Sequence, residues 1–181
     1  MSHLTVYAED RPATPLIDTG DAGEIADELG EAGIRFERWK AAHDLPPEAD
    51  NDAIIAAYRP EIERLIRERG YRTFDVVSMH PQHPDKDAFR KKFLDEHVHS
   101  EDEVRFFVRG QGLFVIHANG RVYAMLCEKD DLISVPANTR HWFDMGPNPS
   151  FTAIRLFNNP EGWVANFTGD KIAGRFPLLD N

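Results

Sequence analysis

Residues 97–112 read HVHSEDEVRFFVRGQG, and this stretch decides the fold because it combines metal-ligand spacing with the alternation of a β-strand. Side chains two apart in an extended strand share a face, so His97 and His99 point the same way and Glu103 has the same parity. Burying this set on one face would be costly without a partner that pairs it. With His141 from a later, neighbouring strand, it offers nitrogen and oxygen ligands that suit iron, nickel, manganese or cobalt.

Arg105 lies two residues beyond Glu103 and therefore shares the face that would hold the metal, as does Phe107. The residues of opposite parity are expected to pack between two sheets, and they are Val104, Phe106 and Val108. The remaining histidines are expected to be ordinary surface or core residues, and they are His3, His43, His80, His83 and His117.

Beyond residue 97 the chain consists of short β-rich runs separated by turn signals, the spacing of an antiparallel sandwich or barrel. Asn119-Gly120 is the strongest hairpin signal among them. The predicted strands are Val104–Val108, Leu113–Ala118, Arg121–Cys127, Leu132–Val135, His141–Asp144 and Phe151–Phe157. This half of the chain predicts a small double-sheet β-barrel.

The chain before residue 95 mixes helical and strand patterns, with Pro60 expected to kink or split the longest helix. The predicted helices cover 21–29, 52–69 and 85–94, and the predicted strands cover 34–40, as an edge strand, and 74–79. We therefore expect one domain over residues 1–181. It divides into an N-terminal α/β decoration (1–95), a metal-binding β-barrel core (96–168) and a C-terminal tail (169–181).

Composition narrows the choice of partner and compartment. The 31 acidic and 21 basic side chains give a net charge of -10, which disfavours duplex nucleic acid and anionic membrane as partners. The longest apolar run, Ala53 to Tyr58, is far too short to span a bilayer, and the N-terminus lacks an export-signal pattern. The lone Cys127 fits a reducing compartment. We expect a cytoplasmic monomer.

Two segments resemble the conserved motifs of the cupin superfamily. The first is His97-Val98-His99 with Glu103 and Gly110, and the second runs from Pro136 to His141. The glycines usual in the second motif are Asp130 and Asn138 here, although asparagine tolerates the left-handed conformation that glycine would supply. The resemblance implies a mainly β fold, a double-stranded β-helix (jelly-roll) barrel with the N-terminal helices and strands packed on it.

A wider set of motifs resembles the bacterial acireductone dioxygenases of methionine salvage. It comprises residues 101–107, 110–114, 141–146, 154–157 and 162–164. The resemblance implies one Fe(II) or Ni(II) per chain, held by His97, His99, Glu103 and His141. It further implies that Arg105 steadies an anionic substrate and that aromatic side chains surround its thioether tail, namely Phe93, Phe143 and Trp163. It offers Glu96, Asp102 and Arg155 as acid/base helpers or as residues that support the site.

The same resemblance implies cleavage of 1,2-dihydroxy-5-(methylthio)pent-1-en-3-one by O₂. In this family iron directs cleavage to 4-methylthio-2-oxobutanoate and formate, and nickel to 3-(methylthio)propanoate, formate and carbon monoxide. Charge counting from the residues agrees with an anionic chelating substrate. A divalent ion with one carboxylate and an enediolate dianion leaves one negative charge, which the guanidinium of Arg105 neutralises.

Other functions fit the same ligands. A different cupin dioxygenase, acting on a quercetin-like or thiol substrate, or a metal-dependent sugar isomerase would use a similar site. A non-catalytic cupin that binds metal or a small anion is the alternative from another class, although it would leave Arg105 idle. Oxygen consumption by the metal-loaded protein separates the dioxygenases from the rest.

Overall fold

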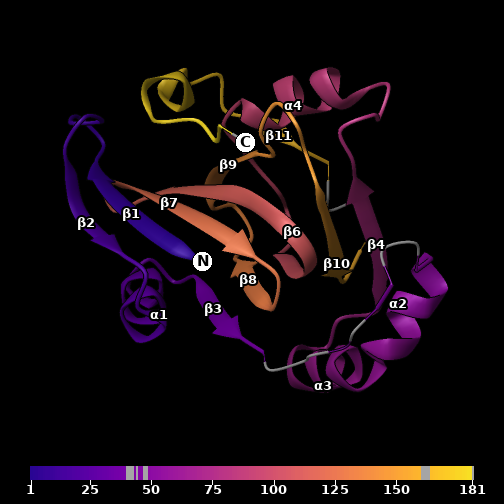
Figure 1. Cartoon of the computed structure of the whole chain (residues 1–181). Coiled ribbons are helices and arrows are strands. Elements are labelled where there is room, and N and C mark those ends of the chain that lie inside the picture. The colour runs from indigo at the N-terminus through magenta and orange to yellow at the C-terminus, as the bar shows by residue number, and fades with distance from the viewer. Residues whose placement is uncertain (40–42, 44, 47–48, 160–163, 181) are drawn as a thin grey trace.

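The computed structural model describes residues 1–39, 43, 45–46, 49–159 and 164–180. Its central element is strand β6 (Glu103–Ala118), which belongs to both of its sheets (Figure 1). Two strands were expected here, with a turn between them, and that expectation is wrong. Gly110 adopts a φ of 67°, which bends the chain without ending the strand, so one long strand passes from the first sheet into the second.

Each half of β6 is paired on both of its edges, and all strand pairs are antiparallel. One sheet has the order β11 (Asn166–Phe167), β5 (His97–Val98), β9 (Arg140–Asp144), β6, β7 (Arg121–Glu128), β1 (His3–Ala8) and β2 (Pro15–Thr19). The other has the order β4 (Thr73–Met79), β10 (Phe151–Phe157), β6, β8 (Asp131–Val135) and β3 (Arg35–Arg38). This open double sheet confirms the mainly β cupin fold, with N-terminal strands that extend its sheets.

The α-helices agree with the sequence signals, and a short C-terminal 3₁₀ helix was not predicted. The helices are α1 (Ala22–Glu31), α2 (Asn51–Ala57), α3 (Arg59–Arg69), α4 (Lys86–Leu94) and the C-terminal 3₁₀ helix (Ile172–Arg175). The predicted 52–69 helix is split, because α2 ends at Ala57, Tyr58 lies between the two helices and Pro60 sits in the first turn of α3. Helix α4 lies across the end of the sheets and packs against β9 (Figure 1). No described helix is long and apolar enough to cross a membrane.

Side chains alternate between the two faces of β6, and the surroundings of these faces were predicted correctly for one face and wrongly for the other. Phe107 packs between the sheets with other aromatic residues, among them Phe114, Phe143 and Phe151. The residues of opposite parity were expected between the sheets too, and this is wrong. Val104, Phe106 and Val108 lie on the outer face of the β10–β6–β8 sheet, where α2 and α3 cover them with Tyr58, Ile62 and Leu65. The helices supply the apolar partner that a second sheet was expected to give.

Candidate metal centre

Four polar side chains from three segments meet at the mouth of the double sheet. His97 on β5 is directly paired with His141 on β9, while His99 follows β5 and Glu103 begins β6. One ligand nitrogen from each histidine can be chosen so that all three lie within 4.8 Å of one another. Oε2 of Glu103 lies 2.9 Å from Nε2 of His141 and 3.3 Å from Nε2 of His99. The predicted quartet is therefore brought together.

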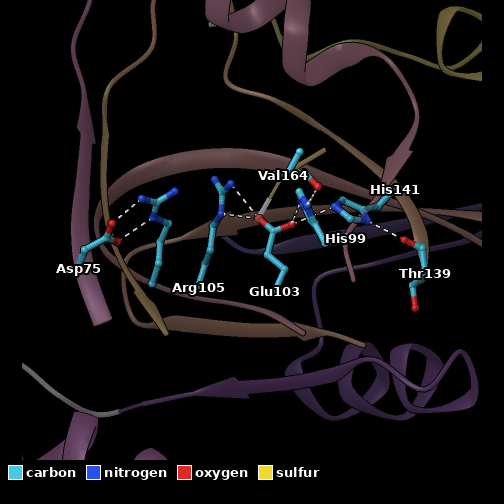
Figure 2. A network of polar contacts seen from close by, with 8 residues as sticks. Asp75, His99, Glu103, Arg105, Thr139, His141 and Val164 are labelled. Atoms are coloured by element: carbon cyan, nitrogen blue, oxygen red, sulfur yellow. Dashed lines mark hydrogen bonds and ion pairs between the residues drawn. The ribbon is translucent and has the colours of Figure 1, made fainter. Parts of the chain in front are cut away.

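Each imidazole of the cluster is oriented by its second ring nitrogen. Nδ1 of His97 donates to the carbonyl of Asp95 at 2.7 Å, and Nδ1 of His141 donates to the carbonyl of Thr139 at 2.7 Å. Nδ1 of His99 donates to the carbonyl of Val164 at 3.2 Å (Figure 2). Carbonyl oxygens only accept, so each ring donates from Nδ1, and its Nε2 carries no proton when the ring is neutral. This is the tautomer that a metal ion requires.

The electrostatics of the cluster also fit a divalent ion. Burial, followed by the charge of His141, lowers the pKa of His97 to about 4, so this ring is neutral at physiological pH. Burial by itself would raise the pKa of Glu103, but Arg105 and the imidazoles of His141 and His99 hold it well below its usual range. Nε2 of His141 and Oε2 of Glu103 are buried, and apart from their 2.9 Å contact with each other and the contact of Oε2 with His99 they have no hydrogen-bond partner among the described residues. A shared cation would satisfy both atoms.

The loop before β9 holds the second motif against the first. The amide of Asn138 donates to the carbonyl of His99 at 2.8 Å, and the amide of Ala137 donates to Oδ1 of Asp102 at 3.0 Å. Asn138 and Asp130, which stand where cupins usually have glycine, both have positive φ, at 62° and 76°. The two departures from the motif thus preserve its backbone conformation, as expected for asparagine.

The cluster opens into a cavity of about 670 Å³. Beside it, Asp75 on β4, Arg155 on β10 and Arg105 on β6 are in register across three neighbouring strands. Arg155 forms a two-pronged ion pair with Asp75, and Arg105 contacts Oε1 of Glu103 through Nε and a terminal nitrogen, both at 2.8 Å (Figure 2). Burial, opposed by Glu103 and reinforced by Arg155, lowers the pKa of Arg105, yet a guanidinium stays charged. The cavity therefore presents two cations beside the cluster.

The remaining walls of the cavity are largely apolar. The predicted pocket residues Phe93 and Phe143 both line it, as do residues that sequence reasoning missed, among them Val77, Met79, Phe89, Phe151 and Phe167. His83 and Lys92 add polar groups at the wall. Trp163, the third predicted aromatic residue, lies outside the described residues. Of the missed residues, only Phe89 could have been predicted, because it lies four residues before Phe93 on the same face of α4. Their rings stack with centroids 6.0 Å apart.

Two predicted helpers lie elsewhere. Among the described residues, neither Glu96 nor Asp102 lines the cavity. The Asp102 carboxylate accepts from the backbone of Ala137, and the Glu96 carboxylate accepts from Thr168 and contacts His117. Arg155 lines the cavity as expected, and Asp75, its partner from β4, carried no signal in the sequence.

A two-sheet β fold that gathers three histidines and a glutamate beside an apolar cavity defines a metal-dependent cupin. Residues 3–165 match the ARD/ARD′ family, and the chain belongs to this family of acireductone dioxygenases, which are enzymes. It is 64% identical to the acireductone dioxygenase of Pseudomonas aeruginosa over the full length of both chains. It is 56% identical to that of Yersinia enterocolitica over 180 residues, 99% of this chain and 100% of the other.

A solved relative has the same fold. The structure of acireductone dioxygenase from Bacillus anthracis, with a cadmium ion in its active centre, matches this chain with a TM-score of 0.82 at 32% identity. The match covers 92% of this chain and 98% of the other. Together with the histidine cluster, this relationship supports a metal-dependent dioxygenase with a single metal centre and a small-molecule substrate.

Proposed function

We propose that this chain cleaves the acireductone 1,2-dihydroxy-5-(methylthio)pent-1-en-3-one with O₂ in methionine salvage. Loaded with Fe(II), it gives 4-methylthio-2-oxobutanoate and formate; loaded with Ni(II), it gives 3-(methylthio)propanoate, formate and carbon monoxide. The ion is held by His97, His99, Glu103 and His141, one per chain. The names of the relatives and the ligand chemistry of the cluster support this assignment.

The observation that carries the proposal is the buried guanidinium of Arg105 placed directly beside the ligand cluster, 2.8 Å from Glu103. When bound, the ion would supply a Lewis acid toward the oxygens of an enediol. The chain's own residues supply the rest of the charge balance. Glu103 contributes one negative charge and Arg105 one positive charge, so a divalent ion leaves room for a dianion. Arg155 and Asp75 cancel each other.

The apolar wall fits the other end of this substrate. Phe93 and Phe143 lie with ring centroids 6.5 Å apart, and the Arg105 guanidinium lies 4.7 Å from the Phe143 ring. A thioether tail against these rings exchanges water for apolar contact, while the charged head stays at the cations. We propose that Trp163 completes this wall. Apolar side chains around the enediolate end of the substrate also exclude water from this electron-rich group.

Oxygen uptake tests the proposal. Apoprotein is reloaded separately with Fe(II) and Ni(II), mixed with acireductone generated anaerobically, and then exposed to O₂ while the products are identified. We expect metal-dependent uptake with formate in both cases and carbon monoxide with nickel alone. Absence of uptake by both fully loaded forms would remove the acireductone assignment. Uptake with the same products from both metals would remove the metal-dependent branch.

Arg105 gives a prediction about substrate rather than metal. Arg105→Met is expected to lower kcat/KM roughly 100-fold, because a buried donor that stabilises developing charge is worth about this much. Metal content should stay at one ion per chain, since the ion itself neutralises Glu103 once the guanidinium has gone. Arg105→Lys keeps the positive charge but loses the two-pronged geometry of the guanidinium, so its kcat/KM should lie between those of the wild type and Arg105→Met.

Arg121 on β7, with a side chain 40% exposed, is the matched control, and Arg121→Met should retain wild-type kinetics. Steady-state kinetics together with metal analysis checks the set. A fully active Arg105→Met enzyme would show that the guanidinium has no part in binding the anion.

We further propose a cytoplasmic monomer built as one domain, and sedimentation velocity at micromolar concentration tests the monomer.

A further inference from the structure

A second buried polar cluster lies on the reverse side of the metal centre. Glu96 is 1% exposed and His117 is 4% exposed, and neither lines the cavity among the described residues. Glu96 immediately precedes His97, and His117 pairs with Arg140, the neighbour of His141. Because side chains alternate across a sheet, Glu96 and His117 face away from the metal ligands. A carboxylate in this position has no route to a substrate in the cavity.

Both oxygens of the Glu96 carboxylate are engaged. Oε2 lies 2.6 Å from Nδ1 of His117, and Oε1 accepts from the hydroxyl of Thr168 at 2.7 Å. The backbone amide of Thr168 also donates to the Glu96 carbonyl at 3.0 Å. On its far side, Nε2 of His117 lies 3.0 Å from Oε2 of Glu9. We call Glu96, His117 and Thr168 the polar latch, since they join β5, β6 and the residue after β11.

The segment fastened by the polar latch reaches two of the metal ligands. Strand β11 has only two residues and, within the described part of the chain, pairs with β5 alone, with Phe167 opposite His97. So short a strand is weakly fixed by its own backbone bonds. Yet the Phe167 ring lies 5.9 Å from the His97 ring, and the carbonyl of Val164 orients His99. The orientation of both imidazoles thus depends on a segment anchored at Thr168.

We infer that the polar latch positions segment 164–168 and thereby aims Nε2 of His97 and His99 at the bound ion. Glu96 is on this view a positioning residue, not an acid or base of the reaction. The inference rests on the proposed metal centre but not on the proposed substrate. It requires that loss of the latch weakens metal binding without removing any ligand, as loss of groups that orient metal ligands generally does.

Two variants test the latch through metal affinity. Glu96→Gln keeps the size of the side chain but removes its charge and replaces one of the two acceptor oxygens with a donor, and Thr168→Val removes the hydroxyl. We expect the dissociation constant for Ni(II) or Co(II), measured by competition with a chelator, to rise roughly 10-fold to 100-fold for Glu96→Gln and roughly 10-fold for Thr168→Val. The double variant should bind metal no more weakly than Glu96→Gln, because the Thr168 hydroxyl acts through its contact with the Glu96 side chain. Thr168→Ser should retain the wild-type value.

Thr19→Val is the matched control. Thr19 also donates its hydroxyl to a glutamate, Glu24, but it lies on β2 at the far edge of the same sheet. The Thr19→Val substitution should lower the melting temperature without changing metal affinity. Wild-type affinity in Glu96→Gln and Thr168→Val would overturn the latch, whereas a wild-type chain that binds neither metal would overturn the proposed metal centre itself.

Kinetics at saturating metal separate positioning from catalysis. If Glu96 acts only through the ligands, excess metal should restore kcat of Glu96→Gln to within about twofold of wild type. The visible spectrum of the Co(II) form should regain its wild-type intensity at the same time. A kcat that stays low while the spectrum is restored would show that Glu96 takes part in the chemistry, and the inference would then be wrong.

Discussion

Glu103→Gln is expected to leave the chain folded but unable to retain a divalent ion. The amide is a poor metal ligand, and it also removes the charge that faces Arg105 at 2.8 Å and His141 at 2.9 Å. We expect metal affinity to fall by at least roughly 100-fold and turnover to fall with it, because loss of a ligand should exceed the effect of losing a group that merely orients one. Metal analysis after dialysis and a chelator titration measure this.

Two further variants separate ligand loss from misfolding. Glu103→Gln leaves the Arg105 guanidinium, 8% exposed, without its carboxylate, which itself destabilises the apoprotein. His97→Gln removes one imidazole without disturbing that pair and should lose metal as well. Glu101→Gln, two residues from the ligand, should behave as wild type. Stoichiometric metal in both ligand variants, with native circular dichroism, would contradict the assignment of the cluster.

Gly110→Ala is expected to give the largest loss of stability for the smallest added group. A Cβ atom at Gly110 would lie 1.7 Å from the carbonyl oxygen of Ser150 and 2.8 Å from Cα of Phe151, both backbone atoms that cannot swing aside. The residue also has a φ of 67°, which disfavours any L side chain. We expect a loss of at least about 3 kcal/mol of unfolding free energy, or about 6–12 °C in Tm.

Gly120→Ala is the control that measures only the cost of a positive φ for a residue with a side chain. Gly120 has a φ of 71°, but a Cβ there would meet nothing within 4 Å. Its cost should be about 1 kcal/mol, and the difference between the two variants isolates the collision with β10. Calorimetry or urea denaturation of both gives the comparison. Equal losses would mean that strands β6 and β10 separate at Ser150 more readily than their pairing suggests.

Local signals predicted the elements that depend on local chemistry. Pro60 split a helix where the sequence placed it, and Asp21 caps α1 by accepting from the amides of Gly23 and Glu24. The four predicted metal ligands could also be found from the sequence, because His97 and His99 have the spacing of strand neighbours on one face and the cupin motifs include Glu103 and His141. These features need only a few residues of context.

Features that depend on non-local pairing could not be predicted. Asp75 becomes part of the site only because β4 happens to lie beside β10, which sets it opposite Arg155. The two glycines Gly110 and Gly112 look like a turn, and their role as a bend within one strand depends on what faces them, Ser150 and Phe143. Glu96 follows the same rule. The family resemblance suggested a chemical role for it, and only the structure shows what its carboxylate contacts.

The unequal lengths of the strands have a consequence for how the protein is supplied with its cofactor. β6 has 16 residues and is paired on both edges of each of its halves, whereas β5 and β11, which carry or cover His97, have two residues each. Opening of the short strands therefore costs far less than global unfolding and occurs far more often. We therefore expect a bound ion to exchange without global unfolding of the chain. Its identity should then follow the free metal of the surroundings, renewed continually, rather than the metal present when the chain first folded.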